Sequence, residues 1–356
     1  MTNQHQALGR LLALFAAARR LADPQDSLGA EARSLLADTT GLSQKGIDLA
    51  LTWSLEHDAT RSDLRALVTT TARVPRAHVL LSANVFVAAL RAIAVAVASS
   101  EQVFVRPSRR EPVIARLLHR GAPHVFQLVE SLAPSPGDHV WAYGTAETLG
   151  ALRAELPGGV VLHGHGPGLG AAVVQQRSKL EPATEVLEGM ARDIILFDQR
   201  GCLSPRLLVL VGELSWAEEW VRGLARHLAA AQHDCPLGAL SREEATEVTM
   251  FRDASSYALP TFPAGKGWLS FDPDGRLLLV PPVGRCLHVT RAEDARQVLA
   301  PLSNVLTAVG LDPLDNLAPS FALAFPKARL SRIGLMQKPP LDGPVDRRVP
   351  SRGELL

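Results

Sequence analysis

The chain has 356 residues, of which 47% are apolar and 21% charged, and its formal net charge is +1. This is a globular composition, long enough for two domains with sizeable cores. The small net charge and the low aromatic content of 5% argue against nucleic acid as a partner, because neither a strong field nor many stacking side chains are available. Three widely spaced cysteines indicate reduced thiols rather than a disulfide framework.

The longest apolar tract, residues 85–98, is too short to span a bilayer and is interrupted by Arg91. The N-terminus has no charged start followed by an apolar core, so it does not resemble a secretory signal. We therefore expect a cytoplasmic protein with no membrane span.

Helices are expected over residues 7–70, because Leu8, Leu11, Leu12 and Phe15 recur at helical spacing and two similar segments follow. Ser27 and Ser43 are the predicted N-caps of these later helices.

From Pro75 onward, short apolar strands alternate with amphipathic helices, which is typical of a parallel α/β sheet. The predicted strands are residues 77–84, 102–108, 138–144, 159–166 and 206–212, and the predicted helices are 85–98, 111–121, 145–157, 182–194 and 215–232. The pattern is less clear after residue 232. The tail after Lys338, rich in Pro, Gly and charge, is expected to be a surface arm or a frayed end.

The segment ILFDQRGCLSP (195–205) places Cys202 in a turn between an apolar run and a strand. A cysteine is most often a small buried apolar residue. At this junction, however, oriented backbone N–H groups would lower the pKa of the thiol and favour the reactive thiolate. Cys235, near a helix end, and Cys286, inside a strand, fit a structural role better.

Asn84 stands between a strand and a helix, where asparagine is common as a turn or cap residue. The alternative is that its side-chain amide donates to a developing oxyanion. The sequence favours neither reading over the other.

Two glycine-containing turns are candidates for contact with a ligand. The first, YGTAETLG (143–150), follows a strand and opens a helix whose N-terminus suits a phosphate. The second, HGHGPGLG (163–170), contains His163 and His165. We expect these two side chains on opposite faces of an extended chain, with no third ligand nearby, so no metal site is predicted.

The order of these motifs resembles that of the aldehyde dehydrogenase superfamily. FDQRGCLSP, VRPSRREPVIARLL and SRIGLMQKPPLDG resemble segments of its acyl-CoA reductase (LuxC-type) branch. The resemblance extends over nearly the whole chain, and the cysteine motif is its most specific element. It implies two α/β domains with parallel sheets and a cleft between them.

The resemblance implies NADPH-dependent reduction of a fatty acyl thioester to the aldehyde through an acyl-cysteine. Cys202 matches the nucleophile, and Asn84 matches the amide of the oxyanion hole. The cofactor-binding positions are matched by Arg106, Pro107 and Ser108 at the adenosine ribose, Gly144, Thr145 and Glu147 at the phosphates, and Gly164 and Gly166 beside the nicotinamide.

The implied domains are residues 1–190 for the cofactor, residues 191–312 for the nucleophile, and a segment 313–356 that returns to the cofactor domain or to a partner subunit. The substrate would be acyl-CoA or an acyl-carrier thioester, received directly or from an acyl-transferring partner protein. A homodimer or higher homo-oligomer is expected.

Two departures from the family pattern bear on function. Arg106 replaces the usual lysine, so NADH is the alternative cofactor, although a guanidinium also binds a 2′-phosphate. HGHGPGLG lacks the glutamate that hydrolytic relatives use to activate water, and this favours a reductase. The alternatives are a non-catalytic relative, an aldehyde dehydrogenase and an acyl-phosphate reductase.

Overall fold

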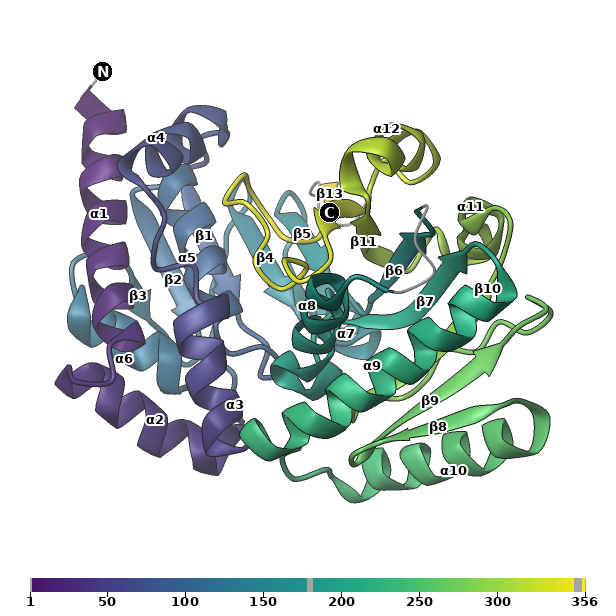
Figure 1. Cartoon of the computed structure of the whole chain (residues 1–356). Coiled ribbons are helices and arrows are strands. Elements are labelled where there is room, and N and C mark those ends of the chain that lie inside the picture. Colours follow the sequence, from purple (N-terminus) through teal and green to yellow (C-terminus); the bar gives the residue numbers. More distant parts are fainter. Residues whose placement is uncertain (1, 178–181, 349–353, 356) are drawn as a thin grey trace. The chain divides into compact units, whose positions relative to one another are not determined.

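The computed structural model describes residues 2–177, 182–348 and 354–355, and the chain forms two compact units (Figure 1). The first unit comprises residues 1–40, 47–167 and 340–356, and the second comprises residues 41–46 and 168–339. Each unit contains one sheet in which most strand pairs are parallel. The predicted α/β class with parallel sheets is confirmed.

The chain begins with helices, as the apolar spacing predicts. These are α1 (Thr2–Ala22), α2 (Ser27–Thr40), α3 (Gln44–Leu49), a π-helical turn (Ala50–Ser54) and α4 (Arg61–Thr70). Ser43 caps α3, because its Oγ accepts the Gly46 N–H at 3.1 Å. The prediction for Ser27 is wrong by one residue, since the carboxylate of Asp26 accepts the Leu28 N–H at 2.9 Å.

The sheet of the first unit runs in the order β13-β5-β4-β1-β2-β3, and only β13 is antiparallel to its neighbour. Its strands are β1 (Arg76–Leu80), β2 (Gln102–Arg106), β3 (Gln127–Leu128), β4 (His139–Tyr143), β5 (Val161–His165) and β13 (Glu354–Leu355). Its helices are α5 (Ala88–Ser99), α6 (Val113–Gly121) and α7 (Ala146–Glu155).

The order of this sheet reverses between β1 and β4. After β1 the chain builds outward through β2 and β3, then returns to place β4 on the other side of β1. In open parallel sheets such a reversal leaves a crevice at the carboxyl ends of the strands, where ligands bind. The segments after β1 and after β4 lie at this edge.

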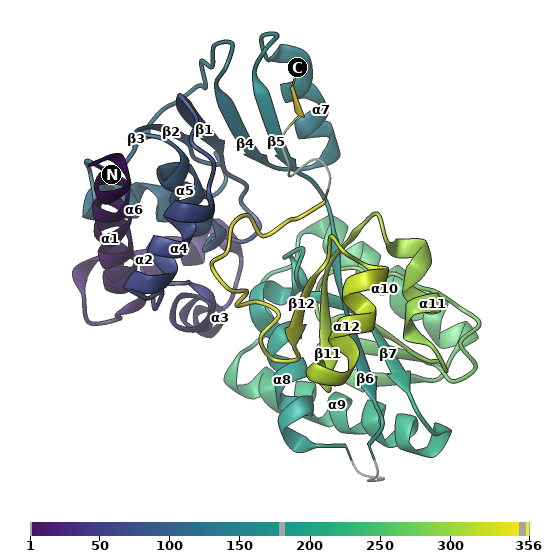
Figure 2. The same cartoon turned by 90° about the horizontal axis from the view of Figure 1, so that it is seen from above.

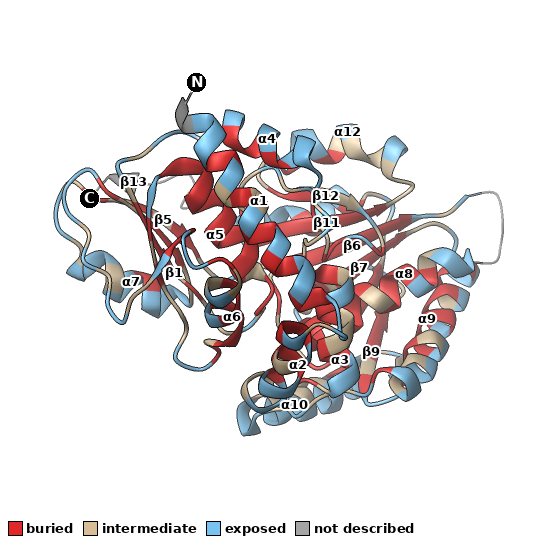
Figure 3. Ribbon diagram, turned by 90° about the vertical axis from the view of Figure 1, so that its left-hand side faces the viewer, coloured by how far each residue is buried: buried red, intermediate tan, exposed pale blue. Residues whose placement is uncertain are grey.

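The two faces of the sheet differ at β4 and β5. Helix α7 lies beside these strands (Figure 2), and its Leu149 packs on Val140, Ala142 and Leu162. The residues that alternate with these in β4 and β5 lie on the opposite face of the sheet, since side chains alternate along a strand. Helix α5 is buried from Ala89 to Ser99, which explains why its sequence is apolar except for Arg91 and Ser99 (Figure 3).

The sheet of the second unit runs in the order β12-β11-β6-β7-β10-β9-β8, and only the β8–β9 pair is antiparallel. Its strands are β6 (Leu169–Gln175), β7 (Pro205–Val211), β8 (Thr261–Ala264), β9 (Gly267–Asp272), β10 (Cys286–Arg291), β11 (Leu306–Asp312) and β12 (Arg329–Arg332). Its helices are α8 (Thr184–Ile195), α9 (Leu214–Asp234), α10 (Arg242–Ala258), α11 (Ala295–Leu299) and α12 (Leu314–Ala324), with 3-10 turns at Leu196–Gln199 and Ala300–Leu302.

The sequence left the elements after residue 232 unassigned, and it missed one strand and misread the tail. Strand β6 was not predicted, because LGAAVVQ is fully buried up to its last residue and so lacks alternation. The tail was predicted to be a surface arm or a frayed end, which is wrong at Asp346 and Arg348. Asp346 and Arg348 are buried, and Arg348 donates to the carbonyls of Gly166 and Pro167 at 3.1 and 2.7 Å.

Candidate active site

Cys202 occupies an accessible position in an otherwise buried segment. From Asp193 to Pro205 every residue is buried except Arg200 and Cys202, which are partly exposed. Arg200 is held by Glu244, with its Nε 2.7 Å from Oε1. Residues 200–204, called the cysteine loop below, lie at the amino end of β7.

A left-handed turn precedes the cysteine loop. Phe197, Asp198 and Gln199 have φ values of 57°, 48° and 65°. A non-glycine residue in this region costs about 1–2 kcal/mol, so surrounding contacts must hold three in succession. Only aspartate among the three tolerates the region comparatively well.

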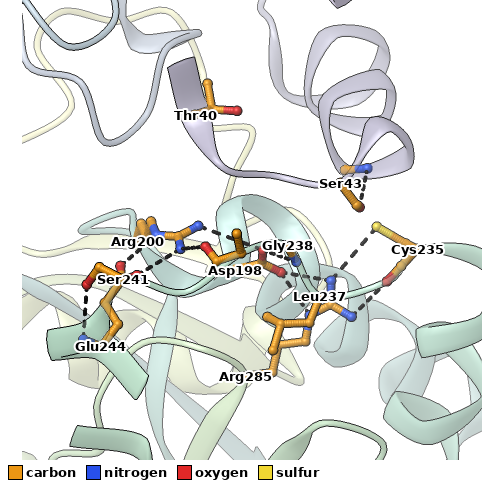
Figure 4. Close-up of polar contacts among 12 residues, drawn as sticks. Thr40, Ser43, Asp198, Arg200, Cys235, Leu237, Gly238, Ser241, Glu244 and Arg285 are labelled. Carbon is orange, nitrogen blue, oxygen red and sulfur yellow. Dashed lines mark hydrogen bonds and ion pairs between the residues drawn. The ribbon is translucent and has the colours of Figure 1, made fainter. Parts of the chain in front are cut away.

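The contacts that hold this turn centre on a buried ion pair (Figure 4). Oδ1 of Asp198 accepts from Nε and Nη2 of Arg285 at 2.9 and 2.8 Å, and both side chains are only 2% exposed. Oδ2 of Asp198 accepts the Gly238 N–H at 3.0 Å. Nη1 of Arg285 donates to the Cys235 carbonyl at 2.8 Å, which connects the pair to the end of α9.

The backbone on both sides of the ion pair is joined as well. The Gly284 N–H donates to the Asp198 carbonyl at 3.0 Å. The side-chain amide of Gln199 donates to the carbonyls of Pro205 and Cys286 at 2.8 and 2.9 Å. The turn before the cysteine loop is therefore fixed to the start of β10.

The other end of the cysteine loop is anchored through Ser204. Its hydroxyl accepts from the Gln337 amide at 2.9 Å, and its carbonyl accepts the Gly170 N–H at 3.1 Å. On α8, Asp193 accepts the N–H groups of Gly334 and Met336 at 2.5 and 3.2 Å. Burial raises the pKa of Asp193 to about 7 despite these two hydrogen bonds.

The other two cysteines are buried, and none of the three is disulfide-bonded. Burial raises the pKa of the Cys235 thiol, and it raises that of Cys286 to about 12. Since a nucleophile needs the thiolate, these positions suit a packing role.

Asn84 lies in the segment after β1, at the carboxyl edge of the first sheet, and is exposed. Its Oδ1 accepts from Nη2 of Arg110 at 3.0 Å. A guanidinium can only donate, so this contact fixes the amide oxygen toward Arg110. The amide N–H groups are thereby directed away from Arg110, as donation to an oxyanion would require.

The other candidate residues of the first unit lie at the same edge. Arg106 ends β2, and Pro107 and Ser108 follow it. Gly144, Thr145 and Glu147 follow β4, with Thr145 capping α7 by accepting the Thr148 N–H at 3.2 Å.

Gly164 and Gly166 lie in β5 and directly after it. Gly164 is buried opposite Ala142 of β4, and the Gly166 carbonyl is the one that accepts from Arg348. The fold thus brings Asn84 and all eight cofactor candidates to the carboxyl ends of β1, β2, β4 and β5, within one unit, whereas Cys202 lies in the other unit.

The expectation that His163 and His165 point to opposite faces is wrong. Side chains two residues apart share a face of a strand, and the two imidazoles stack on Trp141 and Tyr143, which are also two apart, at 4.4 Å each. Among the described residues, neither nitrogen of His165 has a hydrogen-bond partner, and burial lowers the pKa of this side chain to about 4.

Asp198 and Arg285 were not identified from the sequence. An aspartate tolerates left-handed backbone, but nothing in FDQRG pairs it with an arginine 87 residues away. Across the described ranges, no group of three or more His, Cys, Asp or Glu side chains is arranged to hold a metal ion. Within the same ranges, no helix is both long and apolar enough to cross a membrane.

The fold is similar to that of aldehyde dehydrogenases. Three solved structures illustrate this. The NAD-dependent aldehyde dehydrogenase of Sinorhizobium meliloti is 15% identical, with a TM-score of 0.66 over 91% of this chain and 74% of that one. The NAD-dependent benzaldehyde dehydrogenase of Corynebacterium glutamicum is 13% identical, with a TM-score of 0.66 over 92% of this chain and 80% of that one. The lactaldehyde dehydrogenase of Escherichia coli is 15% identical, with a TM-score of 0.64 over 92% of this chain and 79% of that one.

The family follows from the sequence. The family model described as acyl-CoA reductase (LuxC) matches residues 123–333, which is more than half of the chain. The chain belongs to this family, and the resemblance drawn from its motifs is confirmed. It is accordingly an oxidoreductase that acts on acyl or aldehyde groups. A search of curated protein sequences gave no match.

Proposed function

We propose that the protein reduces a fatty acyl thioester, such as acyl-CoA, to the aldehyde through a covalent acyl-Cys202 intermediate. The observation that carries this proposal is the cysteine loop, in which a partly exposed cysteine is held by backbone anchored at both ends. Such anchoring is what a nucleophile requires, because its orientation is then set before the substrate binds.

In the first half-reaction, the Cys202 thiolate attacks the thioester carbonyl. A bond forms between Sγ and the acyl carbon, the oxyanion collapses, the bond from that carbon to the coenzyme A sulfur breaks, and coenzyme A leaves as its thiolate. The Asn84 amide and the backbone N–H of Cys202 are proposed to donate to that oxyanion. The Arg110 contact supports this role by leaving the amide donors of Asn84 available.

In the second half-reaction, the acyl-cysteine is reduced and the resulting thiohemiacetal releases aldehyde, which returns Cys202 to the thiolate. The bound nicotinamide cofactor would supply the hydride. The stretch HGHGPGLG offers no carboxylate to activate water there, so this chain favours reduction of the intermediate over hydrolysis.

The residues at the carboxyl edge of the first sheet fit a nicotinamide cofactor. The exposed N-terminus of α7 at the reversal between β1 and β4 suits the phosphates, with Gly144, Thr145 and Glu147 around it. Arg106, Pro107 and Ser108 would lie at the ribose, where a guanidinium suits the 2′-phosphate of NADPH, with NADH as the alternative. Gly164 and Gly166 would allow close approach beside the nicotinamide.

Mass spectrometry of the intact protein tests the proposal. The wild-type protein is mixed with hexanoyl-, dodecanoyl- or hexadecanoyl-CoA, first alone and then with NADPH. We expect an acyl adduct on Cys202 that disappears with NADPH as aldehyde is released, and Cys202→Ala should give neither. Aldehyde formation at the wild-type rate by Cys202→Ala would refute the mechanism. No adduct with any donor would favour a carrier-protein thioester or a non-catalytic relative.

A further inference from the structure

We propose that Asp198 and Arg285 are positioning residues for Cys202, which hold the left-handed turn that orients the cysteine loop for acyl transfer. This inference rests on the proposed function of Cys202. Neither side chain is placed to touch a substrate, because both are 2% exposed. Their effect on the reaction would pass through the backbone.

The turn and its partner segment both contain residues with left-handed backbone. Phe197–Gln199 are left-handed, and so are Gly284 and Arg285, with φ values of 92° and 64°. The ion pair, the Gly284 N–H to Asp198 carbonyl bond and the Gln199 amide join these two segments at one point. Removing the central charge pair therefore loosens both segments together.

The backbone direction of the cysteine loop is set by this turn. The Arg200 N–H donates to the Phe197 carbonyl at 3.0 Å, and the Ser204 N–H donates to the Gly201 carbonyl at 3.1 Å. These bonds leave little freedom between Gln199 and Cys202. The direction of the Cys202 N–H, the proposed oxyanion donor, is consequently set by the turn.

A second contact of Asp198 supports the assignment. Its Oδ2 lies 3.8 Å from Nη1 of Arg200 and accepts the Gly238 N–H at 3.0 Å. Arg200 in turn pairs with Glu244, which closes the capping box of α10 with Ser241 (Figure 4). Asp198 thus connects the start of the cysteine loop directly to the segments of Gly238 and Arg285, and α10 is joined to it through Arg200.

The test compares Asp198→Asn with a matched control, Asp272→Asn. Asparagine keeps the size of Asp198 and its tolerance of left-handed backbone. Asp272 is also buried, and it accepts the backbone N–H groups of Asp274, Gly275 and Leu277. It differs in position, because it lies at the carboxyl end of β9, whereas the cysteine loop lies at the amino end of β7. Circular dichroism and urea midpoints report whether each variant folds.

Acylation is measured with whichever of hexanoyl-, dodecanoyl- and hexadecanoyl-CoA labels the wild type fastest. We expect the limiting acylation rate of Asp198→Asn to fall about a hundredfold, while the half-saturating acyl-CoA concentration stays within about twofold, because the Asp198 side chain is too buried to contact the acyl-CoA. Asp272→Asn should keep both values. A folded Asp198→Asn that acylates at the wild-type rate would overturn the inference.

Asp198→Asn alone leaves the Arg285 charge buried without its partner, which could unfold the protein. The double variant Asp198→Asn/Arg285→Gln controls for this, since it removes both charges of the pair. We expect it to fold and to stay slow in acylation, whereas recovery of the wild-type rate would contradict a positioning role for the charge pair.

The rate at which iodoacetamide alkylates Cys202, measured on the peptide that contains it, separates the proposed function from the positioning role. Alkylation requires no acyl donor and should slow about tenfold in Asp198→Asn, because oriented backbone favours the reactive thiolate. If the wild type forms no adduct with any of the three acyl-CoAs but alkylation still slows, acyl-CoA fails as the donor and the positioning of Cys202 stands. If the wild type is acylated and both rates are unchanged in Asp198→Asn, the positioning role fails alone.

Discussion

Gly170→Ala tests how closely the cysteine loop packs against β6. A Cβ at this position would lie 2.5 Å from the Leu203 carbonyl oxygen and 2.8 Å from that of Ser204. Both atoms belong to the backbone of the loop, so no side-chain rotation relieves the contact. The Gly170 N–H also donates to the Ser204 carbonyl, which holds the two segments together.

The displacement can be worked out from these distances. Carbon–oxygen contacts of this kind under 3.0 Å essentially do not occur, so the 2.5 Å contact must open by about 0.5 Å. Overpacking of this size typically costs about 1–3 kcal/mol of stability. A misplacement of about 1 Å can lower a rate about a hundredfold, so half that distance predicts about a tenfold loss of acylation.

The assay is the limiting acylation rate of Cys202 together with the urea midpoint, and the control is Gly9→Ala. A Cβ at Gly9 meets no atom of the described residues within 4 Å, and Gly9 lies inside α1, so this change should stabilise the protein by up to about 1 kcal/mol. Gly170→Ala with wild-type stability and an unchanged acylation rate would refute the argument that β6 fixes the loop.

Further predictions concern the first unit. Asn84→Ala should lower the acylation rate about a hundred- to a thousandfold with no change in urea midpoint, because the side chain is exposed; an unchanged rate would remove Asn84 from the oxyanion site. Arg106→Ala should raise the KM for NADPH by a factor at least about ten times larger than the factor for NADH. Steady-state kinetics with each cofactor measures both values, and an equal rise for the two would argue against contact with the 2′-phosphate. His165 has a folded pKa of about 4, below its ordinary 6.5, so its stabilising contribution is complete above about pH 6.5 and is lost as the pH falls toward 4. On going from about pH 7.5 to 5, the wild type should therefore lose about 2 kcal/mol more than His165→Phe, which keeps an aromatic ring on Tyr143; parallel losses in urea denaturation would contradict this.

Local pattern was enough to predict most of the first unit. Strands β1, β2, β4 and β5 and helices α5 to α7 each combine an apolar run of the right length with a clear boundary. The candidate residues at strand ends then follow from topology, because parallel strands bring their carboxyl ends to one edge. The family resemblance supplied the roles that spacing alone could not assign.

Other elements were beyond the reach of local pattern. Strand β6 is buried on both faces, so its residues show no alternation, and its glycine at position 170 indicated a turn rather than close packing on the cysteine loop. The N-cap of α2 was misplaced by one residue because Asp26 and Ser27 are both good caps, and only the hydrogen bond distinguishes them.

The sequence by itself determined the α/β class, the position of Cys202 at a helix–strand junction and the gathering of polar and glycine residues after parallel strands. Only the tertiary structure decided how that cysteine is held. Three left-handed residues in a row are unfavourable on their own, so their conformation depends on the buried Asp198–Arg285 pair. A contact between residues so distant in the chain exists only once the second unit has folded, and no local pattern can encode it.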